Sequence, residues 1–183
     1  MSEKTALVVI DVQNGVVANA YQRDEVLANI AQLLEKARST DTPVIYVQHH
    51  FTEGNDMRYG SDSWQIHPAI APREGEVIVH KTSPDAFVDT TLQAELEKLG
   101  IERLVMVGAQ TEMCVESSAR RAPAQGFNVT LVSDAHTTDD RKSLKAPQII
   151  ALVNEALNGF WAGAYTETEK NVTVKPTNEI EFS

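Results

Sequence analysis

Short apolar runs that alternate with helical segments constrain the fold of this chain most. The first run, at residues 6–10, reads Ala-Leu-Val-Val-Ile, as expected of a strand that is buried on both faces. The segment at 24–39 then places apolar side chains three and four residues apart, which predicts an amphipathic helix capped by Asp24. Strands that alternate with helices in this way favour a mostly parallel sheet between two layers of helices.

The same alternation continues along the rest of the chain. We therefore expect a three-layer α/β/α fold with a six-stranded, mostly parallel sheet. A long polar stretch at 49–73 is expected to be a loop that is functional or carries short structure of its own. The tail from residue 171 is expected to end in a short strand at 180–182. The remaining strands are expected at 44–47, 76–80, 104–107, 129–132 and 164–166, and the remaining helices near 90–99, 112–125 and 144–157.

Length and charge bound the class of protein. The 183 residues suit one domain that spans the whole sequence, 1–183. Sixteen Lys and Arg against 26 Asp and Glu give a net charge of −10, which disfavours nucleic acid and anionic membranes as partners. No apolar run approaches the roughly 20 residues of a membrane helix, and the polar N-terminus lacks a signal-peptide core. We therefore expect a cytoplasmic protein.

The single cysteine, Cys114, cannot form an internal disulfide and is either an inert core thiol or a reactive one. Cys114 follows the expected strand at 104–107 after a short turn. Asp11 and Lys81 directly follow two other expected strands. Because the carboxyl ends of parallel strands meet at one edge of the sheet, we expect these three side chains to lie close together.

A carboxylate, an ammonium and a thiol at one sheet edge can form a nucleophilic site. At the start of a helix, the Cys114 thiolate would be favoured by the helix dipole and by Lys81. Asp11 would accept the thiol proton and later deliver it to a leaving group. The alternative for each residue stays open, since Asp11 could be a turn residue, Lys81 a solvated charge and Cys114 a core thiol.

The segments around these residues resemble the isochorismatase-like cysteine hydrolases, the superfamily that includes nicotinamidases. The resemblance extends from residue 6 to about residue 140, with the matching segments in the same order. They are Ile-Asp-Val-Gln at 10–13, Ser-Trp-Gln-Ile-His-Pro at 63–68, Lys-Thr-Ser-Pro-Asp-Ala-Phe at 81–87, Gly-Ala-Gln-Thr-Glu-Met-Cys-Val at 108–115, Arg-Arg-Ala at 120–122 and Leu-Val-Ser-Asp-Ala at 131–135.

This resemblance implies a sheet order of 3-2-1-4-5-6 and a catalytic triad of Asp11, Lys81 and Cys114. It also implies a cis peptide bond between Ala109 and Gln110, and an oxyanion hole made by the backbone N–H groups of Gln110 and Cys114. A homo-oligomer, either a dimer or a tetramer, is implied as well.

One departure from nicotinamidases concerns their metal, which is bound by an Asp and several His after the second strand. Here Gln48 stands about where the metal-binding Asp would be. The remaining His49, His50 and His67 could in principle bind zinc. Without the carboxylate we expect no metal and no other cofactor, and nicotinamide is a weak substrate guess.

The presence of Cys114 favours cleavage of a C–N bond in a small amide-like substrate through a thioester. Gln13, Trp64, Phe87 and Glu112 lie in or beside the matching motifs and are candidate substrate-binding residues, with both aromatic rings placed to sandwich a flat molecule. A vinyl-ether hydrolase of the isochorismatase type, and a non-catalytic small-molecule-binding protein, stay as alternatives. Rapid alkylation of Cys114 by iodoacetamide near neutral pH would favour the enzyme, since it indicates a lowered thiol pKa.

Overall fold

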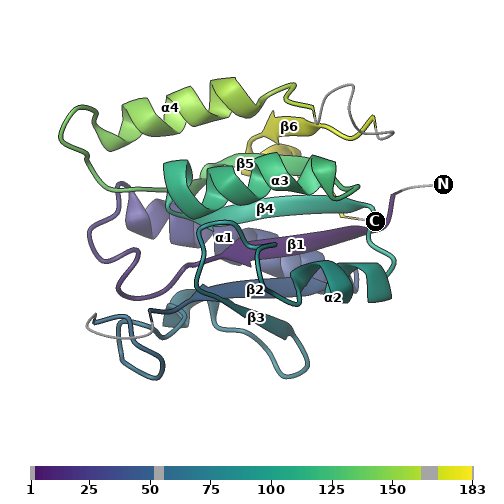
Figure 1. Ribbon diagram of the computed structural model, residues 1–183, viewed down its shortest axis with the longest axis horizontal. Coiled ribbons are helices and arrows are strands. Elements are labelled where there is room, and N and C mark those ends of the chain that lie inside the picture. The colour runs from purple at the N-terminus through teal and green to yellow at the C-terminus, as the bar shows by residue number, and fades with distance from the viewer. Residues whose placement is uncertain (1–2, 52–55, 162–168, 183) are drawn as a thin grey trace.

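A six-stranded parallel sheet forms the centre of the protein in a computed structural model that describes residues 3–51, 56–161 and 169–182 (Figure 1). The strand order is β3-β2-β1-β4-β5-β6, and every neighbouring pair is parallel. This confirms the expected fold class and order. The strands are β1 (Thr5–Ile10), β2 (Val44–His49), β3 (Val77–Lys81), β4 (Arg103–Ala109), β5 (Asn128–Thr137) and β6 (Val172–Lys175).

Helices cover both faces of this sheet (Figure 1). Helix α1 (Arg23–Ser39) packs on one face, while α2 (Leu92–Lys98), α3 (Glu116–Ala124) and α4 (Ala146–Leu157) pack on the other. None of the helices in the described ranges is long and apolar enough to cross a bilayer. Three short helical segments complete the described structure: the 3-10 helices η1 (Pro68–Ile70) and η3 (Thr177–Glu179), and the π-helical turn η2 (Thr111–Val115).

The central strands β1 and β4 are buried on both faces except at Arg103, which explains their almost unbroken apolar sequence. In β1, Ala6, Val8 and Ile10 join the core under α2, α3 and α4, whereas Leu7 and Val9 join the core under α1. Neighbouring side chains on a strand point to opposite faces, so a strand with two covered faces needs apolar residues at every position.

The C-terminal part of the chain differs from the expectation for the last two strands. The sixth strand is Val172–Lys175, paired with β5, and the stretch expected for it, 164–166, lies outside the described residues. The expected strand at 180–182 is absent from the described tail. Ile180 and Phe182 pack into the core under α1 instead. Their apolar side chains are buried there without strand pairing of their backbone.

Element ends differ from the sequence expectation at two places. Asp24 lies in the first turn of α1, and Gln22 is the capping residue, with φ of 48° and no side-chain capping bond. Strand β5 continues to Thr137, five residues past the expected end, because a register shift lets His136 and Thr137 pair with the end of β4. The strand therefore takes in residues 133–137 of the stretch between the expected strand at 129–132 and the helix expected from residue 144.

Gly108 allows strands β1 and β4 to lie side by side at the edge that bears Asp11. Its φ is +132°, and a Cβ atom built on it would lie 2.0 Å from the carbonyl oxygen of Ile10. No side chain fits in that space, so a glycine is required where β4 passes the end of β1.

Candidate active site

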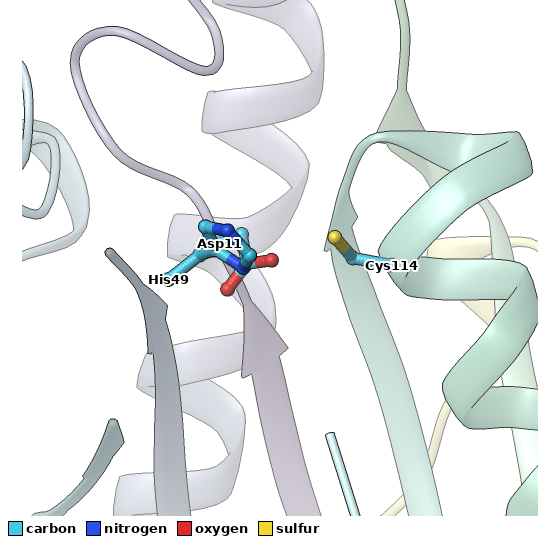
Figure 2. Close-up of side chains that lie close together, drawn as sticks. All are labelled: Asp11, His49 and Cys114. Carbon is cyan, nitrogen blue, oxygen red and sulfur yellow. The ribbon is translucent and has the colours of Figure 1, made fainter. Parts of the chain in front are cut away.

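Asp11, Lys81 and Cys114 come together at the carboxyl edge of the sheet. Asp11 directly follows β1, Lys81 ends β3, and Cys114 lies in the turn η2 that follows β4. In Figure 2 the Asp11 carboxylate, at the end of β1, and the Cys114 sulfur, on the helical turn η2, point toward one another. The proximity expected from the topology is therefore found in the structure.

Lys81 and Asp11 form a buried ion pair. Lys81 Nζ lies 2.7 Å from Asp11 Oδ2, and the two side chains are 0% and 1% exposed. Lys81 also donates to the carbonyl oxygen of Ser83 at 2.8 Å. Because a buried charge without a partner is costly, these contacts fix the ammonium and the carboxylate in one arrangement.

Burial raises the pKa of the Asp11 carboxyl above its usual range, although the Lys81 ammonium and a hydrogen bond from the Cys114 thiol oppose this. Burial, followed by the negative charge of Asp11, raises the pKa of the Cys114 thiol to about 12. The shift of the thiol pKa is opposite to the lowering expected from a helix start. The reason is that the thiol is shielded from water and lies beside a negatively charged carboxylate.

The turn that carries Cys114 is held by its backbone. The N–H groups of Met113 and Val115 donate to the carbonyl oxygen of Gln110 at 3.1 and 3.2 Å, and the Ala109–Gln110 peptide bond is cis. The Ser118 hydroxyl donates to the carbonyl oxygen of Cys114 at 2.7 Å. The expected regular helix at this point starts as a π-helical turn, and α3 begins after it.

A cavity of about 360 Å³ opens onto Asp11 and Cys114. This volume suits a small molecule rather than a polymer. Apart from Asp11, no side chain that carries a charge at neutral pH lines it in the described part of the chain. Its other described lining residues are Gly15, Val16, His49, Phe51, Met57, Thr82, Pro84, Gln110 and Met113.

His49 belongs to this site, although the sequence pattern singled it out only as a possible metal ligand. It ends β2, its side chain is buried, and its Nδ1 atom lies 3.2 Å from Lys81 Nζ. Burial, then the charge of Lys81, lowers the His49 pKa to about 4, so the ring is neutral at physiological pH. Its position at the carboxyl end of a central strand is the signal that could have found it.

Gln48 occupies the place of the nicotinamidase metal carboxylate, and its surroundings do not fit a metal site. Its amide group is buried and donates to the carbonyl oxygen of Trp64 at 2.9 Å. His67 points elsewhere, because its Nδ1 atom accepts a hydrogen bond from Ala69 N–H at 3.3 Å and caps η1. The His50 ring packs beside His80, with 6.3 Å between ring centroids.

Another group of three residues does bring possible metal-binding atoms together. Donor atoms of Asp11, His49 and Cys114 all lie within 4.8 Å of one another (Figure 2). The Lys81 ammonium contacts two of these residues, at Asp11 Oδ2 and His49 Nδ1. A metal cation in this group would face that positive charge at close range, so the residues present do not suit one.

Gln13 and Trp64 support the site from outside the cavity lining. Gln13 donates to the carbonyl oxygens of His49 and Trp64 at 2.8 and 2.7 Å, and it accepts from His49 N–H at 2.9 Å. The Trp64 ring packs on Tyr59 and His80, with centroid distances of 4.5 and 5.8 Å. Both residues therefore join the loop after β2 to the ends of β1 and β2.

Phe87 and Glu112, the other two candidate substrate-binding residues, also lie outside the cavity lining. Phe87 packs against Phe127 in the core, with 6.1 Å between ring centroids, so the expected aromatic sandwich with Trp64 does not form. Glu112 forms an ion pair with Arg141. That same Arg141 donates to the side-chain oxygen of Gln110 at 2.8 Å, which holds the turn before Cys114.

The fold and site together define an α/β protein with a small-molecule cavity at the carboxyl edge of its sheet. The chain belongs to the isochorismatase family of hydrolases, because the model of the isochorismatase domain matches residues 5–152. It is 32% identical over 173 residues to the uncharacterized isochorismatase family protein YddQ of Bacillus subtilis, covering 88% of this chain and 96% of YddQ.

Two further comparisons bear on the activity and the fold. The chain is 35% identical over 156 residues to a streptothricin hydrolase of Streptomyces noursei, covering 84% of this chain and 56% of that enzyme. A crystal structure of a putative isochorismatase hydrolase from Oleispira antarctica superposes with a TM-score of 0.83 at 30% identity. That superposition covers 98% of this chain and 96% of the other.

Proposed function

We propose that this protein is a cysteine hydrolase that cleaves the C–N bond of a small, uncharged amide-like substrate. The observation that carries the proposal is the buried Asp11–Lys81 ion pair, with the Cys114 sulfur within 4.8 Å of an Asp11 carboxylate oxygen at the wall of a cavity. The similarity to a streptothricin hydrolase supports amide hydrolysis as the type of reaction.

The first half-reaction begins when the substrate carbonyl carbon enters between Cys114 and Asp11. The thiol proton passes to Asp11 as the sulfur–carbon bond forms, and the carbonyl electron pair moves to oxygen. Backbone N–H groups of Gln110 and Cys114 stabilise that oxyanion. The oxyanion collapses, the C–N bond breaks, and Asp11 gives its proton to the departing nitrogen.

The second half-reaction releases the acyl group. Asp11, again a carboxylate, takes a proton from water as the water oxygen attacks the thioester carbon. The thiolate leaves and recovers the proton from Asp11, which restores the starting state. The raised pKa of Asp11 suits this alternation, because a carboxyl group with a higher pKa takes up a proton at neutral pH more readily. Lys81 keeps the carboxylate in place throughout.

The lack of a cationic side chain in the described cavity lining disfavours the vinyl-ether alternative. Isochorismate carries two carboxylates, and the described lining of the cavity offers no cationic side chain to bind them. The Lys81 ammonium is fully buried and already paired with Asp11. Burial of an anion beside the Asp11 carboxylate would be unfavourable.

The test is ammonia release from a panel of primary amides, ureides and carbamates by the wild type and by Cys114→Ala. We expect the wild type to hydrolyse at least one compound and the variant to lose the activity by a factor of about 10⁴ or more. Circular dichroism of the variant controls for folding. Full activity in Cys114→Ala would refute covalent catalysis, and a panel with no substrate would favour a non-catalytic binding protein.

A further inference from the structure

The two ring nitrogens of His49 have different surroundings. The side chain is 8% exposed, and Nδ1 lies 3.2 Å from Lys81 Nζ. Nε2 is buried and has no hydrogen-bond partner in the described structure. The ring lines the cavity and packs edge-on against Phe51, with 4.7 Å between ring centroids. A buried polar atom beside a cavity is satisfied when a ligand supplies its partner.

The contacts of Lys81 decide which nitrogen carries the proton. Around Nζ lie Asp11 Oδ2 at 2.7 Å, the Ser83 carbonyl oxygen at 2.8 Å and His49 Nδ1 at 3.2 Å. An ammonium has three N–H donors and no acceptor, so Nδ1 accepts a hydrogen bond from it. A neutral imidazole that accepts at Nδ1 carries its hydrogen on Nε2. The unpartnered atom is therefore a donor.

The competing arrangement would place the hydrogen on the other nitrogen. The Ser83 carbonyl oxygen lies near the His49 ring and favours a proton on it. That oxygen already accepts from Lys81 at 2.8 Å, and a proton on Nδ1 would point at the Lys81 ammonium. The contact with Lys81 therefore favours the Nε2–H form.

We propose that the Nε2–H group of His49 binds a hydrogen-bond acceptor in the acyl part of the substrate, next to the attacked carbonyl group. This inference rests on the proposed function, in which the carbonyl oxygen itself is bound by Gln110 and Cys114. One ring nitrogen of His49 and the Cys114 sulfur lie within 4.8 Å of each other. An acceptor at hydrogen-bond distance from His49 then lies about two bonds from the attacked carbon.

The substrate class follows from this donor and from the cavity wall. An uncharged amide with an ether oxygen, a hydroxyl group or a second carbonyl beside the scissile carbonyl satisfies the buried N–H. An acyl group of the same shape without an acceptor leaves the donor unsatisfied and binds less well. His49 is thus a specificity-determining residue that distinguishes between acyl groups.

The tautomer is tested directly by long-range ¹H–¹⁵N NMR of the wild-type protein. The chain has five histidines, and the His49 signals are assigned by their loss in His49→Asn. We expect a neutral ring with the hydrogen on Nε2 at pH 7. A hydrogen on Nδ1 would overturn the proposal, because Nε2 would then be an acceptor.

Two variants separate the pocket donor from the contact with Lys81. His49→Gln places an amide N–H near the Nε2 position, and His49→Asn places an amide oxygen near the Nδ1 position, where it can still accept from Lys81. The substrates are methoxyacetamide and butyramide, which have the same chain length and differ by one ether oxygen. The readout is the ratio of their kcat/KM values in each protein, so that intrinsic reactivity cancels between proteins.

We expect His49→Gln to keep the wild-type preference for methoxyacetamide within about threefold, and His49→Asn to reduce it by about tenfold or more. The reverse pattern, or an unchanged ratio in both variants, would overturn the proposal and leave His49 as a support for Lys81. A wild type that hydrolyses other amides but neither of this pair would also overturn it. If the wild type hydrolyses no amide at all, the proposed function fails. The NMR measurement then still shows whether Nε2 of His49 carries the hydrogen and can act as a hydrogen-bond donor.

Discussion

At the scale of single residues, the surroundings of Cys114 keep its thiol protonated at neutral pH. Burial, followed by the charge of Asp11, raises the pKa of the Cys114 thiol to about 12. A resting thiol is less exposed to oxidation and alkylation than a thiolate. The iodoacetamide criterion from the sequence therefore does not separate an enzyme from a binding protein here, because both would react slowly.

Removal of the Asp11 charge should make the thiol more reactive while it destroys catalysis. In Asp11→Asn the thiol loses its anionic neighbour and keeps the Lys81 ammonium nearby, so its pKa should fall. We expect iodoacetamide to modify Asp11→Asn at least about tenfold faster than wild type at pH 7.5, with no amide turnover. Mass spectrometry reports this cleanly because Cys114 is the single cysteine.

The wild-type rate provides the pH control for this prediction. Because the thiol pKa is raised to about 12, alkylation of the wild type should still increase with pH above pH 10. A wild type that reacts faster than Asp11→Asn, or whose rate levels off near pH 7, would contradict the assignment of a protonated resting thiol.

At the scale of elements, the separation of β1 from β4 decides whether Asp11 and Cys114 meet. Six residue pairs join these strands, from Thr5–Arg103 to Ile10–Gly108. The last pair, Ile10–Gly108, lies immediately before Asp11. The two strands approach closely at this pair, since Gly108 has no Cβ atom to clash with Ile10. The turn η2 then carries Cys114 back toward Asp11.

Gly108→Ala should therefore remove the fold or cost more than about 4 kcal/mol of unfolding free energy, since the new Cβ would meet the Ile10 backbone. Gly100→Ala is the matched control, because Gly100 also has a positive φ, of +66°, but a Cβ atom there would meet no other atom within 4 Å. It should cost only about 1 kcal/mol. Urea unfolding of both variants measures this, and equal effects would contradict the steric argument.

At the scale of the whole molecule, charge and cavity both select against anionic substrates. The chain has a net charge of −10. Among the described residues that line the cavity, Asp11 alone carries a charge at neutral pH, and this charge is negative. Lys81, whose charge acts on the Cys114 thiol, is fully buried and is already paired with Asp11. A substrate anion would gain no partner there to offset the loss of its hydration.

We therefore expect succinamate, which is an anion at neutral pH, to be hydrolysed at least about a hundredfold less efficiently than butyramide, its uncharged counterpart. The measurement is kcat/KM for ammonia release at pH 7.5. It is repeated at high salt, which screens the long-range repulsion by the net charge but not the local cost of burial. Similar values for both compounds would contradict the assignment of an uncharged substrate.

The sequence by itself determined the sheet and the edge at which chemistry would occur. Unbroken apolar runs specified buried parallel strands, and the residues after them specified Asp11, Lys81 and Cys114. These are local signals, because periodicity and strand ends are visible in neighbouring residues. Strand β6 at Val172–Lys175 was not predicted, since its short Val-Thr-Val run is defined as a strand by pairing with β5 and not by a local pattern.

Only the tertiary structure decided which other side chains face the cavity and in which protonation state they rest. Gln13, Trp64, Phe87 and Glu112 lie in the matching motifs, yet their contacts point them into the supporting structure. The role of His49 and the raised thiol pKa depend on Lys81 and Asp11, which come from distant parts of the chain. Burial and neighbouring charge set these properties, and neither is encoded in a local pattern of residues.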